Sequence, residues 1–134
     1  MCGAGVRPRP TVVVAAVIED RHRFLVTRRP PGVHLAGMWE FPGGKIDPDE
    51  SHVAALRREL REELGVDADV GELVHETTHA YADLTVALYF YRCRLVGEPR
   101  PLLGQEMRWV PREELPSLGF PAADAELIDL LQRR

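Results

Sequence analysis

The stretch GKIDPDESHVAALRRELREELGV, residues 44–66, determines how the rest of the chain is interpreted. It places Glu59, Glu62 and Glu63 within one turn of a predicted helix, with Glu50 just upstream. Residues three and four apart on a helix are neighbours, and like charges at that spacing repel each other by roughly a few tenths of a kcal/mol per pair. A divalent cation would turn that repulsion into attraction, and a set of oxygen ligands suits Mg²⁺ or Mn²⁺. The stretch therefore predicts a metal site on a helix.

The alternative for the same helix is an ordinary solvated face, because Arg58 and Glu62 also form a stabilising i,i+4 pair. The residues before the helix favour the metal site. Pro42, Gly43 and Gly44 predict a turn after an apolar run, and Lys45 follows directly.

The bounds of the helix follow from its capping residues and its apolar spacing. Ser51 or Asp49 is suited to cap the start, and Gly65 stands where a helix commonly ends. Apolar residues recur at helical spacing and predict the buried stripe, namely Val53, Leu56, Leu60 and Leu64. The carboxylates lie off this stripe, so we expect them to face outward.

Written as a pattern, the stretch is G-x5-E-x7-R-E-U-x-E-E-x-G-U, in which U is aliphatic. Every fixed position is filled, by Gly44, Glu50, Arg58, Glu59, Leu60, Glu62, Glu63, Gly65 and Val66. By this pattern the chain resembles the Nudix hydrolase family. The resemblance implies an α/β (α+β) fold, with a mixed β-sheet sandwiched between α-helices.

Length predicts a single domain, which the resemblance makes a Nudix hydrolase domain over residues 1–134, with a flexible segment at about residues 1–10. With 45% hydrophobic and 28% charged residues, the chain has the composition of an ordinary globular protein. A net charge of -4 gives no basic face for duplex nucleic acid. The apolar run near the start is short and β-branched, so it predicts a strand and not a membrane span. Two cysteines form no disulfide framework, and a reduced, cytoplasmic location is expected.

The pattern of apolar residues and turn signals predicts alternating strands and helices. Strands are expected at Thr11–Ile18, Arg23–Arg29, Met38–Phe41, Val70–His79, Leu84–Leu95 and Met107–Val110. A second amphipathic helix is expected at Ala122–Gln132.

The resemblance also implies roles for individual residues. The catalytic residues it implies are Glu59, Glu62, Glu63 and Arg58. Arg58 would orient the helix by holding a carboxylate. Metal contacts fall to Gly43, Glu59, Glu62, Glu63 and, from a loop further along the chain, Glu106. Glu59 is alternatively the general base, and Glu98 is a weaker candidate than Glu106. The ion, Mg²⁺ or Mn²⁺, would neutralise phosphate charge and lower the pKa of a bound water.

Phosphate contacts are expected from three residues near the pattern. The segment GMWEFPGGK is similar to that of MutT-like nucleoside triphosphate pyrophosphohydrolases, which release pyrophosphate and act on oxidised guanine nucleotides. Gly44 lets the substrate approach the backbone, and Lys45 is a phosphate contact or a surface lysine. Arg29 resembles the phosphate-contacting arginine of these enzymes.

The base is expected to meet Asp124, within the segment FPAAD just before the last helix. Guanine-sanitising members have an asparagine there. An ionised aspartate only accepts hydrogen bonds, which suits the amine of cytosine or the N1/N2 edge of guanine. The alternative is that Asp124 caps the helix. Phe41 and Phe120 are candidates to sandwich the base, or else core residues.

Several alternatives remain open at this point. The substrate is oxidised dGTP or a CTP/dCTP-type nucleotide, with ADP-ribose or a dinucleoside polyphosphate as other choices. Tyr81 lies roughly where dinucleoside polyphosphate hydrolases have a tyrosine. A non-catalytic nucleotide-binding regulatory module is the alternative to an enzyme, and the chain is a monomer or a homodimer.

Overall fold

The β-branched run TVVVAAVI forms most of the central strand β1 (Thr11–Asp20) of the computed structural model, which describes residues 9–133. The predicted flexible segment lies outside the described residues, except for its last two positions. No helix within residues 9–133 is long and apolar enough to cross a membrane.

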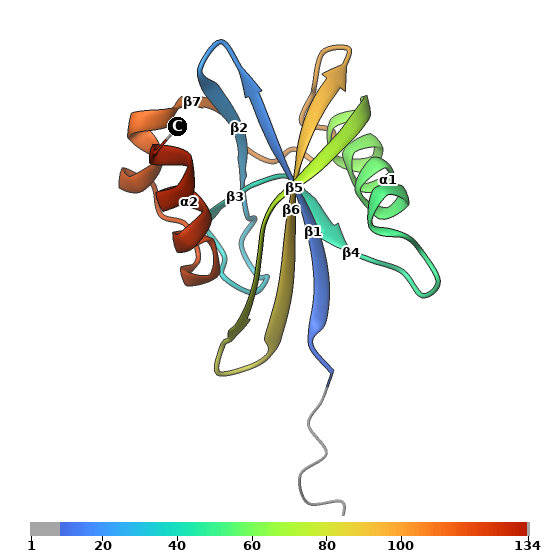
Figure 1. Cartoon of the computed structure of the whole chain (residues 1–134), viewed down its shortest axis with the longest axis vertical. Helices are drawn as coiled ribbons and strands as arrows, with labels where there is room; N and C mark the ends of the chain where they lie inside the picture. The colour runs from blue at the N-terminus through green and yellow to red at the C-terminus, as the bar shows by residue number, and fades with distance from the viewer. Residues whose placement is uncertain (1–8, 134) are drawn as a thin grey trace, which may run out of the picture.

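Within residues 9–133, seven strands form one mixed sheet around β1 (Figure 1). On one side β1 pairs in parallel with β6 (Thr85–Val96), which pairs antiparallel with the edge strand β5 (Asp67–Ala80). On the other side β1 pairs antiparallel with β4 (Gly43–Lys45) and, at its end, with β2 (Arg23–Arg28). The strands β3 (Trp39–Glu40) and β7 (Met107–Pro111) pair with β2.

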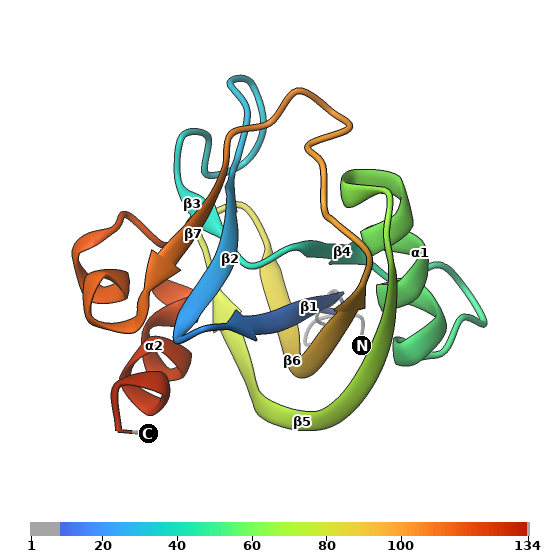
Figure 2. The same ribbon diagram turned by 90° about the horizontal axis from the view of Figure 1, so that it is seen from above.

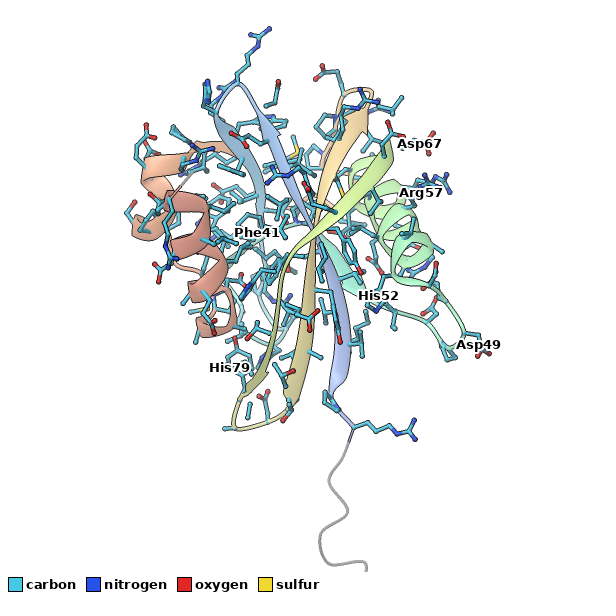
Figure 3. All side chains as sticks on the ribbon, in the orientation of Figure 1. Phe41, Asp49, His52, Arg57, Asp67 and His79 are labelled. Carbon is cyan, nitrogen blue, oxygen red and sulfur yellow. The ribbon has the colours of Figure 1, made fainter. Side chains whose placement is uncertain are left out.

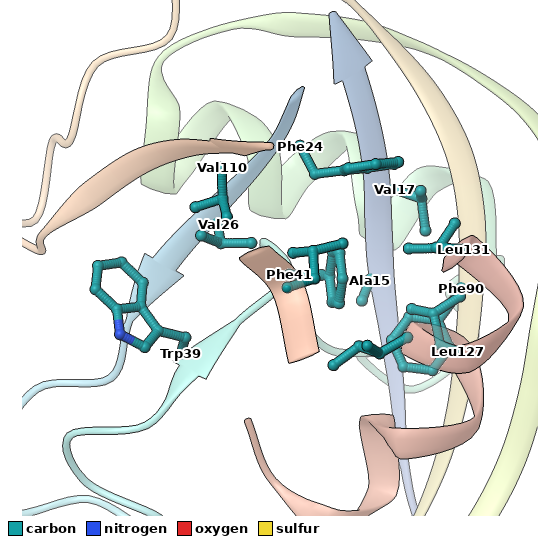
Figure 4. Close-up of a cluster of buried hydrophobic side chains, with 12 residues drawn as sticks. Ala15, Val17, Phe24, Val26, Trp39, Phe41, Phe90, Val110, Leu127 and Leu131 are labelled. Carbon is teal, nitrogen blue, oxygen red and sulfur yellow. The ribbon is translucent and has the colours of Figure 1, made fainter. Parts of the chain in front are cut away.

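The two α-helices lie on opposite sides of the strands (Figures 1 and 2). One core lies between the strands and α1 (His52–Leu64), and its largest members include Leu25, Leu56 and Leu60. The other lies beside α2 (Ala125–Gln132) and contains Phe24 and Phe90 (Figure 4). The predicted mixed sheet between helices is confirmed.

The helix α1 has the predicted ends. Ser51, and not Asp49, caps its start, because the Ser51 hydroxyl accepts a hydrogen bond from the Ala54 N–H at 3.1 Å. Gly65 ends it in the left-handed region, with φ of 67°. Val53 was wrongly expected in the buried stripe, since its exposed fraction is 39%. The stripe of residues four apart continues back to His52, which contacts two tyrosines of β6, and this turns Val53 toward solvent.

The predicted strands differ from the observed ones by up to three residues at their ends. Three further elements differ in kind. Gly43 and Gly44 begin the short strand β4, and an added Cβ at Gly43 would lie 2.0 Å from the Val14 carbonyl oxygen. Glycine is therefore needed here for close backbone packing and not for a turn. The last helix begins as a 3-10 turn, η2 (Ala122–Asp124), and another 3-10 segment, η1 (Arg112–Ser117), was not predicted.

Candidate active site

Arg58 organises the start of the site. Its guanidinium donates to the Glu50 carboxylate from Nε at 2.8 Å and from Nη2 at 2.9 Å. It also donates to the Lys45 carbonyl at 3.1 Å and to Glu59 Oε1 at 2.8 Å. Arg58 thus fixes α1 to the strand and loop that precede it. These hydrogen bonds lower the pKa of Glu50 to about 2, so Glu50 is ionised at neutral pH.

Glu59 and Glu63 are one turn apart on the side of α1 that faces β4. An ideal Cβ added at Gly44 would lie 2.5 Å from the Glu59 carboxyl carbon, so the Glu59 carboxylate packs directly on the Gly44 backbone. Burial raises the pKa of Glu63 to about 9, and its neighbours Glu59 and Glu40 add to the rise. Glu63 Oε2 is buried and has no hydrogen-bond partner among the described residues. A carboxyl group in this position holds a proton that a cation can replace.

Glu62 lies on the exposed side of the cluster. More than half of its side-chain surface is exposed, and its nearest charged partner is Arg58 at 3.5 Å. Within residues 9–133, no three or more His, Cys, Asp or Glu side chains are already gathered as a set of metal ligands. The chemistry of the donors nevertheless fits a hard divalent cation, because two close carboxyl groups share one buried space and one oxygen there has no partner.

A cavity of about 600 Å³ opens beside this cluster. Its apolar wall comes from β1, β6 and Phe41, and its polar groups come from the two ends. Gly43, Gly44 and Lys45 line the end next to α1, and Asp124 lies in the wall supplied by η2. An apolar slot with a few polar groups is the usual form of a small-molecule site.

Arg29 and Glu40 form an ion pair in the wall of this cavity. Arg29 Nη1 lies 2.9 Å from Glu40 Oε1, and Arg29 Nε donates to the His34 carbonyl at 2.6 Å. Burial raises the pKa of Glu40 even though Arg29 opposes the rise. Arg29 therefore lies in the cavity wall with two of its nitrogens already bound to protein groups, and its role as a phosphate contact stays a prediction.

The proposed sandwich of a base between Phe41 and Phe120 is wrong. The two rings stack on each other, with centroids 5.3 Å apart, and leave no room for a base between them. Phe41 is only 3% exposed and lies in the interior on the α2 side (Figures 3 and 4). It forms part of the cavity wall as a core residue.

Asp124 is buried, with an exposed fraction of 4%. Although it stands at the N-cap position of α2, its side chain makes no capping hydrogen bond, so the alternative of a helix cap is wrong. Burial raises its pKa to about 7, Glu40 adds to the rise, and Arg29 opposes it. Asp124 is thus present in both the protonated and the ionised form near neutral pH.

Glu106 is held by two arginines. Its carboxylate lies 3.3 Å from Arg28 Nη1 and 3.6 Å from Arg108 Nη2, and both arginines pack over the Trp39 ring. The neighbouring Gln105, and not Glu106, has its side chain bonded to α1, where its Nε2 donates to the Glu63 carbonyl at 3.0 Å. The role of Glu106 as a metal ligand stays a prediction.

The sequence did not predict the ion pair of Glu40 with Arg29 or the contact of Gln105 with α1. The available signal for Glu40 was a charged residue inside the apolar strand segment WEF. Gln105 gave no signal, because its contact joins two segments 42 residues apart.

The mixed sheet between helices, with a carboxyl cluster beside a cavity, fits a class of proteins that bind a divalent cation together with a small anionic ligand. The comparison with known sequences gives the family. A model of the NUDIX domain matches residues 13–130, and the chain belongs to this family, whose hydrolases generally use divalent metal ions.

Individual relatives agree with that assignment. The CTP pyrophosphohydrolase of Escherichia coli (strain K12) is 40% identical over 116 residues, which cover 86% of this chain and 84% of that protein. An 8-oxo-dGTP diphosphatase of Haemophilus influenzae is 37% identical over 121 residues, covering 89% of each. The solution structure of the E. coli ORF135 protein superposes with a TM-score of 0.82 at 36% identity, covering 93% of this chain and 90% of that one.

Proposed function

We propose that this chain hydrolyses a nucleoside triphosphate to the monophosphate and pyrophosphate, in the manner of MutT-like enzymes and with Mg²⁺ or Mn²⁺. The observation that carries the proposal is the half-buried pair of neighbouring carboxyl groups, Glu59 and Glu63, of which Glu59 packs against Gly44 in the cavity lining. The names of the relatives support the same reaction class.

The metal would be held by Glu59, Glu62 and Glu63, with Gly43 beside them. When bound, it would neutralise phosphate charge and lower the pKa of a water. Glu63 would give up its proton to the ion, because a carboxylate ligand binds in its ionised form. Arg58 would keep Glu59 in place from the opposite side.

The triphosphate would lie along the Gly44 and Lys45 end of the cavity. Gly43 and Gly44 line this end of the cavity, and the exposed Lys45 supplies a positive charge there. Arg29, paired with Glu40, supplies a second positive charge in the cavity wall. The two positive charges would help to orient the nucleotide.

The base would lie against Phe41 and meet Asp124. A protonated carboxyl group both donates and accepts, which matches N3 and the amine of cytosine. An ionised carboxylate only accepts, which matches the N1 and N2 hydrogens of guanine. With a pKa of about 7, Asp124 suits both bases, and the names of the relatives make cytidine triphosphates the first choice and 8-oxo-dGTP the second.

Two other functions receive less support. Hydrolysis of dinucleoside polyphosphates was suggested by Tyr81 alone, and the hydroxyl of Tyr81 already accepts a hydrogen bond from the Ala123 N–H within the protein. For a non-catalytic binding module, loss of carboxylates is expected, whereas every acidic position of the pattern is kept.

The test is product analysis over a panel of CTP, dCTP, dGTP and 8-oxo-dGTP. One pyrophosphate per monophosphate is expected with Mg²⁺, and none with excess EDTA. Asp124→Ala should raise KM for the preferred nucleotide and leave the metal requirement unchanged. Orthophosphate as the product, or hydrolysis that persists in EDTA, would exclude the proposed reaction.

A further inference from the structure

Three segments far apart in the sequence meet at the Asp124 end of the cavity. They are residues 29–38 between β2 and β3, the turn at residues 81–84 between β5 and β6, and η2. Polar contacts join these segments, which suggests that the position of Asp124 depends on residues outside its own turn.

Tyr81 makes the contact to η2. Its hydroxyl accepts a hydrogen bond from the Ala123 N–H at 3.1 Å, across 42 residues of sequence. Ala123 directly precedes Asp124, whose own side chain makes no capping hydrogen bond. The backbone of η2 therefore sets where the Asp124 carboxyl group lies, and Tyr81 holds that backbone.

His34 joins the same tyrosine to the other wall of the cavity. Its ring meets Tyr81 edge-on, with centroids 5.1 Å apart, and its Nδ1 lies 2.7 Å from Asp83 Oδ2. Its carbonyl accepts from Arg29, which is paired with Glu40. A continuous series of contacts thus runs from Glu40 to η2.

We propose that Tyr81 is a positioning residue for base selection, which sets the place of Asp124 through the Ala123 N–H. This inference rests on the proposed function, since it assumes that Asp124 meets the base. A tyrosine that only supports the fold would affect all nucleotides alike, whereas a positioning residue changes KM for the nucleotide that Asp124 selects.

The test is a double-mutant cycle between Tyr81→Phe and Asp124→Ala, read as kcat and KM for CTP and 8-oxo-dGTP. Phenylalanine keeps the ring contacts and removes only the hydroxyl. In the wild-type background Tyr81→Phe should raise KM for the preferred nucleotide by about two- to tenfold, the size expected for one neutral hydrogen bond. It should leave kcat and the metal requirement unchanged.

In the Asp124→Ala background, Tyr81→Phe should have no further effect on KM. Tyr89→Phe is the matched control, because Tyr89 packs against His52 of α1 in the other core. If Asp124→Ala changes the nucleotide preference and Tyr81→Phe adds in full to that change, the positioning role is wrong and the proposed function stands. If Asp124→Ala leaves the preference unchanged, the proposed base contact is wrong and the inference falls with it.

Discussion

The buried carboxyl group of Asp124 lowers the free energy of unfolding measurably at neutral pH. Its pKa is about 7 in the folded protein, against an ordinary value of 3.8. Between these two values the unfolded chain is ionised at this position and the folded protein is protonated, so the unfolded state binds fewer protons. The free energy of unfolding therefore falls as the pH rises from about 4 to about 7, and this contribution is constant above pH 7.

The magnitude follows from the difference between the two pKa values. At about 1.36 kcal/mol for each pH unit, the loss amounts to about 4 kcal/mol at its largest. Asparagine has nearly the same shape and no titration. Relative to the wild type, Asp124→Asn should therefore gain up to about 4 kcal/mol of stability between pH 4 and pH 8, with most of the gain below pH 7.

The assay is urea unfolding of both proteins at several pH values, without added metal. Asp129→Asn is the matched control, because Asp129 lies exposed on the same helix. Its stability difference from the wild type should not vary with pH in this way. If the difference between Asp124→Asn and the wild type is also independent of pH, then Asp124 is ionised in the folded protein and the stated burial effect is wrong.

Three further predictions concern the metal, the glycine strand and the base. Mg²⁺ binding at pH 7.5 should release about one proton, because the Glu63 carboxyl group has a pKa of about 9. Titration calorimetry in buffers of different ionisation enthalpy measures the number of protons released. If no proton is released, Glu63 is not a ligand of the ion. Gly44→Ala should lower kcat/KM on the order of 10²-fold, because the added methyl group displaces the Glu59 carboxylate. Gly119→Ala is the control and should have little effect, because a Cβ added at Gly119 meets no atom within 4 Å. Equal losses in both glycine variants would contradict that reading. The ratio of kcat/KM for CTP to that for 8-oxo-dGTP should fall as the pH rises through about 7, and an equal ratio at pH 6 and pH 8 would exclude Asp124 as the cause.

The sequence predicted the features that depend on local spacing. The ends of α1 at Ser51 and Gly65, and the order along the chain of every strand except β4, follow from capping chemistry and apolar periodicity. The mixed sheet followed from the resemblance. Local patterns predict helix ends and strand order because capping and apolar spacing involve residues only a few positions apart in the sequence.

What the sequence could not give depends on contacts between distant segments. The Gly43 backbone is pressed against β1, which no turn rule anticipates. Phe41 and Phe120 were considered as the two sides of a base sandwich, but their rings stack on each other, and only the packing of the fold decides whether a gap remains between two rings. The contact of Tyr81 with Ala123 spans 42 residues and has no local sign in the sequence.

The most direct measurement is the rate of pyrophosphate release by Glu63→Gln with saturating Mg²⁺ and nucleotide. Glutamine fills the same space and removes the ionisable group. The rate should fall by a factor of ~10² or more, the size found when a charge-stabilising group is lost from an active site. Glu72→Gln, a change on the exposed part of β5, should leave it unchanged. A rate in Glu63→Gln equal to that of the wild type would contradict metal-assisted cleavage at the carboxyl cluster of α1.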